Sequence, residues 1–238
     1  MTKQAHQQKK IEEFYDEYVQ RQLKVGVNKR HYSILEKLKK AGLKSSHKVL
    51  EIGCGIGTFT GLIIKEITSG SVVAMDISGA SIKYANDHNT YSNLSYIHAD
   101  AANHDFGNQQ FDVIVMPDVI EHIPLDLHCQ LFAKLAQVLK PDGFIFIHIP
   151  SPYYLQWAID QGHETQVIDQ PIYTDVLLSN ITPANLIVHF LETYSIWIKE
   201  GDYQQIVLKH HPKLVEFTHY KESTSLLSKV KAKLSKKF

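Results

Sequence analysis

The feature that most constrains the fold is a regular alternation of short apolar runs with helical patterns between residues 47 and 149. Apolar runs at 47–52, 71–75, 94–98, 111–116 and 144–149 predict strands, and three-to-four periodicity at 58–67, 81–87 and 127–139 predicts helices. Strands joined by helical crossovers pair in parallel and are covered on both faces. The order therefore predicts an open α/β sheet.

The flanking segments complete a three-layer organisation. Residues 1–44 show two helical patterns and are predicted to form an N-terminal lid, with the core at 45–212 and a substrate-side insertion at 152–185. Strand-like runs at 186–198 and 203–208 flank Gly201-Asp202, which permits a hairpin. We predict a Rossmann-like three-layer sandwich with a seven-stranded, mostly parallel sheet whose last strand is antiparallel. The stretch 152–174 is expected to be loop-rich.

A glycine-rich turn follows the first predicted strand. Gly53, Gly55 and Gly57 follow G-x-G-x-G, and Thr58 stands where the dinucleotide fingerprint G-x-G-x-x-G has its last glycine. The turn also contains no Lys or Arg and is preceded by Glu51, so a pyrophosphate would be poorly bound. The glycines are expected to allow close approach of a ligand, although a tight strand-to-helix turn alone would also use them.

Carboxylates stand at or near the ends of four of the five expected parallel strands. They are Glu51, Asp76, Asp100 and Asp118. Open α/β sheets bind ligands at this edge, and carboxylates favour hydroxyl groups, amines and positive charge. S-adenosylmethionine has all three features.

The same segments resemble a known family. Residues 51–57 look like the first motif of class I S-adenosylmethionine-dependent methyltransferases, particularly the small-molecule branch similar to ubiquinone-biosynthesis methyltransferases. Residues 74–78, 98–101, 111–123 and 139–144 resemble its later motifs, so the similarity covers roughly 48–150. The resemblance implies that Asp76 binds both ribose hydroxyls and that Asp100 lies near the adenine amine. The expected cofactor-binding residues are Glu51, Gly53, Cys54, Gly55, Gly57, Asp76, Ile77, Asp100, Ala101 and Asp118.

Simpler structural roles stay open for several of these residues. Asp76 would also suit a helix cap before Ser78, Asp100 a loop cap, and Glu51 an orienting contact to the turn. The Asp-x-x-Glu spacing after the fourth strand is equally a capping arrangement.

Two histidines are candidates for a general base. His122 lies just past the fourth predicted strand, and His163 lies with Glu164 in the insertion. A hydroxyl acceptor would benefit from a base, whereas an amine acceptor could lose its proton to water, so O- and N-methylation both stay open. Polar and aromatic residues of the insertion favour a small polar metabolite or sugar as acceptor. The alternatives are a nicotinamide-dependent oxidoreductase and a non-catalytic S-adenosylmethionine-binding regulatory protein.

The lid and the tail offer further candidates. Phe14, Tyr15 and Tyr18 are expected to pack against the sheet or to cover the cofactor, and Arg30 and His31 are left open as partners of its methionyl carboxylate. Residues 213–238 form a basic tail with an amphipathic pattern, which predicts either a frayed terminus or weak contact with an anionic membrane surface or acidic partner.

Composition excludes several classes of partner. Twenty-five Lys and Arg balance twenty-five Asp and Glu, which disfavours nucleic acid. Cys54 and Cys129 form no Cys-x-x-Cys pair, which indicates reduced thiols and a cytoplasmic protein. With no signal-peptide pattern, no apolar run of about 18 residues and no His-Glu-x-x-His or cysteine cluster, we expect no membrane span and no required metal.

Overall fold

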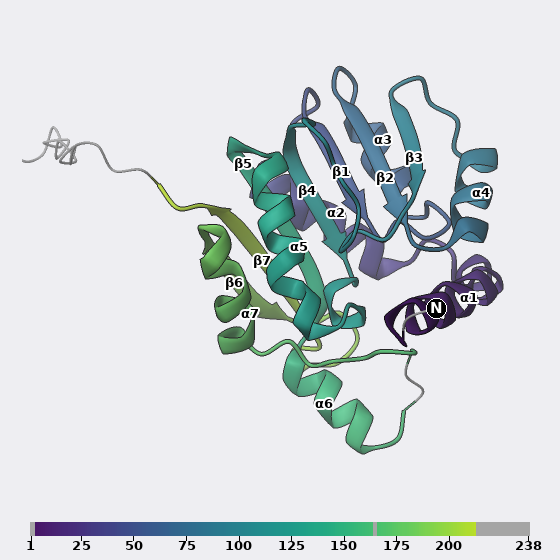
Figure 1. The fold of residues 1–238 in the computed structure, drawn as a ribbon, viewed down its shortest axis with the longest axis vertical. Helices are drawn as coiled ribbons and strands as arrows, with labels where there is room; N and C mark the ends of the chain where they lie inside the picture. The colour runs from purple at the N-terminus through teal and green to yellow at the C-terminus, as the bar shows by residue number, and fades with distance from the viewer. Residues whose placement is uncertain (1–2, 164–165, 213–238) are drawn as a thin grey trace, which may run out of the picture.

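Five apolar runs form the parallel part of a central sheet in the computed structural model, which describes residues 3–163 and 166–212 (Figure 1). The strands are β1 (Lys48–Ile52), β2 (Ser71–Asp76), β3 (Leu94–His98), β4 (Phe111–Pro117) and β5 (Leu139–Pro150). They lie in the order β3-β2-β1-β4-β5, and every neighbouring pair among them is parallel. The five strands predicted from the sequence are confirmed, and β5 begins before its Pro141-Asp142-Gly143 segment instead of after it.

The last two strands form the predicted antiparallel hairpin. β7 (Tyr203–His210) pairs antiparallel with β5 on one side and with β6 (Leu186–Tyr194) on the other. The sheet therefore has seven strands in the order β3-β2-β1-β4-β5-β7-β6, and the last strand in sequence is antiparallel, as predicted. β6 stops at Tyr194 because residues 195–202 turn, and the Asp202 carboxylate accepts hydrogen bonds from the backbone N–H groups of Ile196 and Trp197.

Helices cover both faces of the sheet because its strand residues alternate between two apolar clusters. α2 (Lys29–Ala41) and α3 (Thr60–Glu66) pack on the face that includes Val49, whereas α5 (Leu125–Val138) and α7 (Thr174–Ile181) pack on the face that includes Leu50. α4 (Gly79–His88) contacts β2 and β3. Two short 3-10 turns, η1 (Ile120–His122) and η2 (Thr182–Ala184), lie between these elements.

The two predicted N-terminal helices have clear boundaries. α1 (Lys3–Val25) ends at Gly26, whose φ of 57° breaks the helical path. α2 then starts from Asn28, whose side chain accepts a hydrogen bond from the Arg30 N–H, while the Asn28 N–H donates to His31 Nδ1. Gly42, with φ of 118°, ends α2.

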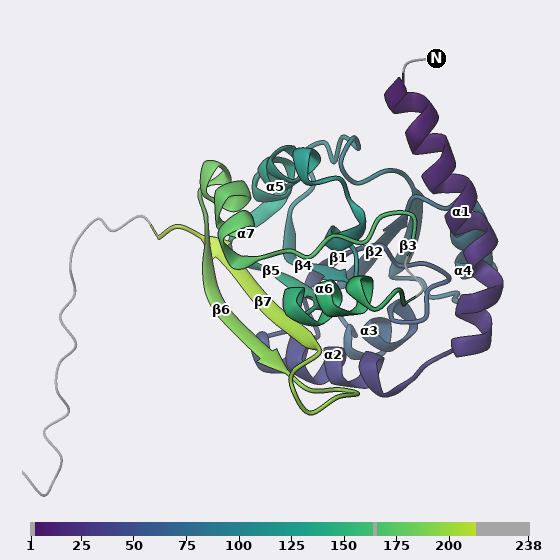
Figure 2. The ribbon, with the colours of Figure 1, turned by 90° about the horizontal axis from the view of Figure 1, so that it is seen from below.

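Two helices lie beyond the carboxyl ends of the parallel strands. Figures 1 and 2 show that α1 lies beside α4. They also show that α6 (Pro152–Asp160) lies in front of the strand ends. Asp16 of α1 accepts hydrogen bonds from the Ser78 hydroxyl at 2.5 Å and from the Ala80 N–H at 3.1 Å, which fixes α1 against the start of α4. The expectation of a loop-rich stretch from Pro152 is wrong for residues 152–160, which form α6. Pro152 suits the first position of the helix because no N–H is needed there, and the side chain of Leu155 anchors the helix by being buried.

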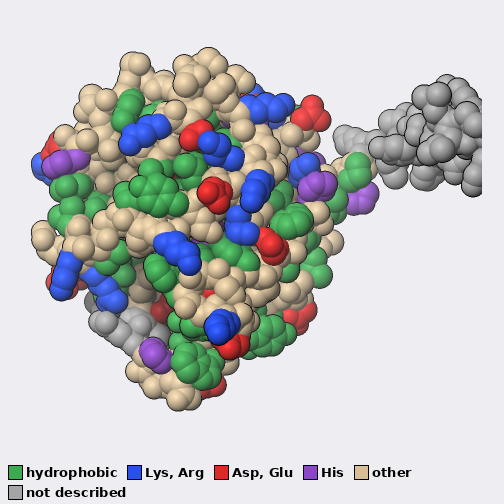
Figure 3. Space-filling view, turned by 180° about the vertical axis from the view of Figure 1, so that it is seen from behind, with side chains coloured by type: hydrophobic (Ala, Val, Ile, Leu, Met, Phe, Trp, Pro, Cys, Tyr) green, Lys and Arg blue, Asp and Glu red, His purple; other side chains and the backbone are tan. Residues whose placement is uncertain are grey.

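The surface agrees with the balanced composition. On the face shown in Figure 3, basic side chains lie among acidic and apolar ones. Among the described residues, no helix combines the length and the apolar character that crossing a bilayer requires. The basic tail at 213–238 lies outside the described residues, so its interactions stay a prediction.

Candidate functional site

A cavity of about 390 Å³ opens at the carboxyl ends of β1, β2 and β4, with α1 along one side. This is the edge at which open α/β sheets hold their ligands. The fold brings together the four carboxylates that the sequence analysis placed at strand ends, although they are far apart in the chain. They line the cavity with two tyrosines of α1: Glu51, Asp76, Asp100, Asp118, Tyr15 and Tyr18.

The glycine turn after β1 shapes the floor of this cavity. The backbone N–H groups of Gly53 and Cys54 both donate to the Met75 carbonyl, which turns the chain sharply away from the strand. Gly53 has φ of 75°, and a Cβ there would lie 2.3 Å from Val119 Cγ2. A side chain at this position would therefore be strained and would clash with the β4 end. Gly53 and Cys54 line the cavity.

The other two glycines of the turn have different neighbours. The Gly55 N–H donates to Asp76 Oδ2 at 2.7 Å, so Gly55 connects the turn to the end of β2. Gly57 faces α4, where its carbonyl accepts a hydrogen bond from the Asn89 amide. Neither glycine is among the residues that line the cavity.

Glu51 of β1 and Asp76 of β2 belong to neighbouring strands. Glu51 is fully buried, and neither of its carboxyl oxygens has a hydrogen-bond partner among the described residues. Burial raises the pKa of Glu51 to about 8, so near neutral pH this carboxyl group is mostly protonated and can donate a hydrogen bond. Burial also raises the pKa of Asp76, although the N–H groups of Ser78 and Gly55 oppose that shift. The α4 cap is Ser78, not Asp76, because the Ser78 hydroxyl accepts from the Ser81 N–H.

Asp100 begins the turn after β3. Its Oδ1 accepts a hydrogen bond from the Ala102 N–H at 3.0 Å, and its Oδ2 accepts one from the Asn103 amide at 2.6 Å. The loop-cap role and the cavity position are therefore both present. Ile77 and Ala101, the neighbours of the two strand-end aspartates, also line the cavity.

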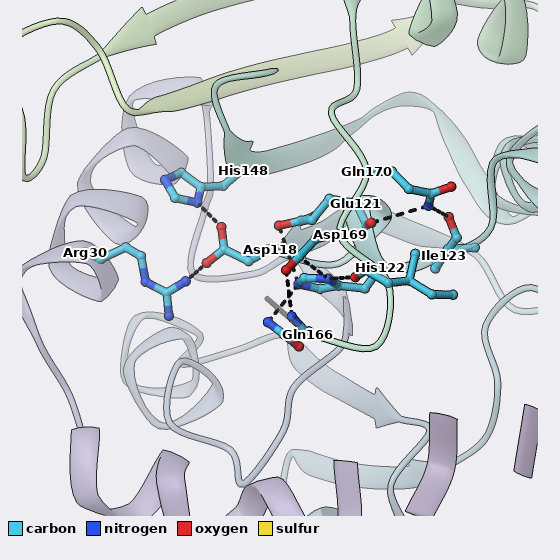
Figure 4. A network of polar contacts seen from close by, with 10 residues as sticks. Arg30, Asp118, Glu121, His122, Ile123, His148, Gln166, Asp169 and Gln170 are labelled. Atoms are coloured by element: carbon cyan, nitrogen blue, oxygen red, sulfur yellow. Dashed lines mark hydrogen bonds and ion pairs between the residues drawn. The ribbon is translucent and has the colours of Figure 1, made fainter. Parts of the chain in front are cut away.

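Asp118 is held by two elements at once (Figure 4). Its φ of 55° is unusual for a residue other than glycine, and its N–H donates to the His148 carbonyl at 2.7 Å. One carboxylate oxygen pairs with Arg30 of α2, and the other lies 2.9 Å from His148 Nδ1. Asp118 does not cap a helix: η1 starts after Val119 without a side-chain cap.

His148 extends this contact across the sheet. Burial lowers the pKa of His148 well below its usual value, and the positive charges of Arg30 and Lys37 lower it further. The ring is therefore neutral, with Nδ1–H donating to the Asp118 carboxylate. Nε2 then accepts from the Tyr194 hydroxyl at 2.8 Å.

His122 lines the cavity beside Asp118 and is enclosed by residues 166–170 (Figure 4). Its Nδ1 lies 2.7 Å from the Ile168 carbonyl and 3.1 Å from Asp169 Oδ1, and its Nε2 lies 3.0 Å from the Gln166 amide nitrogen. Glu121, itself buried, places Oε1 3.8 Å from Nε2. Burial alone would lower the pKa of His122, but Glu121, Asp169 and the Ile168 carbonyl outweigh it and the pKa is raised.

His163, the second candidate base, is not brought to the cavity. It is exposed after α6, with its ring centroid 5.3 Å from that of Trp157. Its neighbour Glu164 lies outside the described residues. The sequence analysis did not single out Asp169, Gln166 or His148, because no periodicity or motif marks them.

Comparison with known proteins agrees with this geometry. Residues 49–143 match a family model described as a methyltransferase domain. A phthiotriol/phenolphthiotriol dimycocerosates methyltransferase of Mycobacterium leprae is 25% identical over 155 residues, covering 63% of this chain and 56% of the relative. A ubiquinone biosynthesis O-methyltransferase of Pasteurella multocida is 27% identical over 124 residues, covering 47% and 50%. The chain thus spans about half the length of these curated relatives.

The fold has matches among solved structures. An S-adenosylmethionine-dependent methyltransferase from Clostridium acetobutylicum superimposes with a TM-score of 0.63 and 15% identity, covering 80% of this chain and 95% of that one. Residues 49–143 thus match a methyltransferase domain, and the fold is that of a solved S-adenosylmethionine-dependent methyltransferase. The parallel strand order brings Glu51 and the strand-end aspartates to one cavity.

The cavity fits the cofactor of this domain class. Buried Glu51 has two carboxyl oxygens without partners in the part of the chain that the structure describes, and each oxygen of Asp76 accepts one backbone hydrogen bond and so keeps a second acceptor position. Hydroxyl and amine groups would satisfy these positions. The cavity therefore has polar groups at β1 and β2 and tyrosine rings at α1 that can contact S-adenosylmethionine.

Proposed function

We propose that this chain transfers the methyl group of S-adenosylmethionine to an oxygen or nitrogen of a small polar metabolite or sugar. The observation that supports this most strongly is the single cavity that contains both the strand-end carboxylates and His122. A hydroxyl or amine acceptor needs a place to send its proton, and His122 is within the same enclosure as the cofactor-binding groups.

The residues of the cavity divide between cofactor and acceptor. When bound, S-adenosylmethionine supplies an activated methyl group that the acceptor attacks as the carbon–sulfur bond breaks. Asp76 would hold the ribose hydroxyls and Asp100 the adenine amine. Asp118 and Arg30 together present one negative and one positive group, which suits the amino and carboxylate groups of the methionyl end.

His122 would act as general base toward a hydroxyl acceptor. Its Nδ1–H is fixed by the Ile168 carbonyl, so Nε2 carries the lone pair that accepts the proton. The resulting imidazolium would be stabilised by Glu121 and Asp169, whose charges already raise the pKa of this ring. General base catalysis of this kind contributes roughly 10²- to 10⁴-fold, and positioning by the enclosing elements contributes further.

The polar groups around His122, namely Glu121, Gln166 and Asp169, favour a small polar acceptor over the phthiotriol and phenolphthiotriol dimycocerosates named for the Mycobacterium leprae relative. The free thiols of Cys54 and Cys129 support a cytoplasmic protein. We propose no nucleic-acid partner, because the chain has no net charge.

Calorimetry followed by a transfer assay tests the proposal. We expect S-adenosylhomocysteine to bind in the micromolar range and NAD not to bind. The protein is then incubated with S-adenosylmethionine and a panel of sugars, phenols, amines and lipid phenols, and methylated products are identified by mass spectrometry. Binding of NAD instead would contradict the proposed cofactor. Tight cofactor binding without transfer to any member of the panel would favour a regulatory protein, and transfer to lipid phenols alone would overturn the proposed acceptor class.

A further inference from the structure

The side chain of Gln166 lies directly on the atom that would receive the acceptor's proton. Its amide nitrogen is 3.0 Å from His122 Nε2, and Gln166 is among the residues that line the cavity (Figure 4). Gln166 comes from the segment between α6 and α7, 44 residues after His122 in sequence.

The direction of this hydrogen bond follows from the other side of the ring. A backbone carbonyl only accepts, so the 2.7 Å contact with Ile168 requires a proton on His122 Nδ1. In the neutral ring Nε2 is then an acceptor, and the Gln166 amide N–H donates to it. In this state, the lone pair needed by a general base is already engaged.

The segment that carries Gln166 is anchored independently of this bond. The Gln170 N–H donates to the Glu121 carbonyl at 3.0 Å, and its side-chain amide donates to the Ile123 carbonyl at 2.8 Å. The Gln166 N–H donates to Asp169 Oδ2 at 2.7 Å. The side chain of Gln166 can therefore rotate away from His122 while Asp169 and the Ile168 carbonyl stay against Nδ1.

We infer that the Gln166 amide occupies the position on His122 Nε2 that the acceptor's O–H or N–H takes, which makes Gln166 a specificity-determining residue. This inference rests on the proposed methyl transfer and deepens it. An acceptor displaces Gln166 only by offering an equivalent donor, so the site selects hydroxyl groups and primary and secondary amines. Acceptor atoms that carry no O–H or N–H, such as alkene carbons, thioethers and tertiary amines, leave Gln166 in place.

The transfer step then balances. The acceptor lone pair forms the new bond to the methyl carbon, and the electron pair of the breaking carbon–sulfur bond goes to sulfur. The acceptor proton moves to His122 Nε2, which gives an imidazolium beside Glu121 and Asp169. After product release the proton leaves to solvent, and the Gln166 N–H returns to Nε2.

Carbethoxylation of His122 tests this inference without a known acceptor. Diethyl pyrocarbonate reacts with an unprotonated imidazole nitrogen, so the rate at His122, resolved by peptide mass spectrometry, reports how available the Nε2 lone pair is. The variants are Gln166→Met, which keeps a similar unbranched shape without a donor, and Gln166→Glu, which offers an acceptor and favours the protonated ring. Gln156→Met is the control, since Gln156 donates one side-chain hydrogen bond to Asp160 on α6, and Gln156 does not line the cavity.

We expect His122 of Gln166→Met to react about 2- to 10-fold faster than wild type, as for release of one hydrogen bond, and His122 of Gln166→Glu to react more slowly. Gln156→Met should match wild type. A shielding role for Gln166 would move both variants in the same direction, and that pattern, or any pattern other than the expected one, overturns the inference. Calorimetry with S-adenosylhomocysteine on the same samples separates the two proposals. If the wild-type protein does not bind S-adenosylhomocysteine, the proposed function is overturned, whereas the pattern of His122 reactivity still decides the role of Gln166.

Discussion

Replacing Asp76 by Ala should weaken cofactor binding far more than it perturbs the rest of the fold. Asp76 Oδ2 accepts from the Gly55 N–H at 2.7 Å and Oδ1 from the Ser78 N–H at 2.9 Å, so each oxygen keeps one acceptor position toward the cavity. A hydrogen bond to a charged group is worth about 1.5–3 kcal/mol. Burial raises the pKa of Asp76 and so disfavours its charged form. We therefore expect the two contacts with the ribose hydroxyls together to contribute about the binding free energy of one hydrogen bond to a charged group.

That magnitude corresponds to roughly a 10- to 150-fold increase in the Kd for S-adenosylhomocysteine. Isothermal titration calorimetry measures it, and Asp76→Asn should lose less because its amide oxygen still accepts. Asp105→Ala is the matched control: Asp105 also accepts a hydrogen bond from a glycine N–H, that of Gly107 at 2.8 Å, but it is exposed and does not line the cavity. A folded Asp76→Ala protein that binds within twofold of wild type would refute the assignment of Asp76 to the cofactor.

Three further outcomes are expected. His122→Leu should lower the rate of methyl transfer to a hydroxyl acceptor by about 100-fold or more while leaving the Kd for S-adenosylhomocysteine unchanged, which single-turnover kinetics and calorimetry separate. Because the pKa of His122 is raised above 6.5 and the base acts unprotonated, activity should rise with pH through that pKa. Asp169→Asn should shift this ascending limb to lower pH, and an unshifted limb would contradict the pairing. Gly53→Ala should destabilise the protein by about 1–2 kcal/mol for its left-handed backbone plus the cost of displacing Val119. Denaturant unfolding compares it with Gly107→Ala, which has the same left-handed backbone cost but no atom within 4 Å of the added methyl group. Equal losses of unfolding free energy in the two variants would show that Val119 moves aside at no cost.

The general position of the site could be predicted because local rules place it. A strand that feeds a glycine turn and a helix needs little more than the apolar run 48–52 and glycines that tolerate positive φ, such as Gly53. Parallel order then puts Glu51 and Asp76 at one edge of the sheet. The partners of His122 could not be predicted in this way, since Asp169 and Gln166 lie in an irregular segment without a motif.

Period and turn chemistry act over a few neighbouring residues, so they were enough to predict the order of the strands along the chain, the hairpin at its end and the sheet edge expected to bind ligands. Which side chains share the cavity depends on the tertiary structure. In that structure residues 152–160 form a helix and His163 is exposed. Asp118 contacts Arg30 and His148, and the Gln166 amide contacts His122. Those contacts join residues 30 to 88 positions apart, and their geometry depends on how whole elements pack, which no local pattern records.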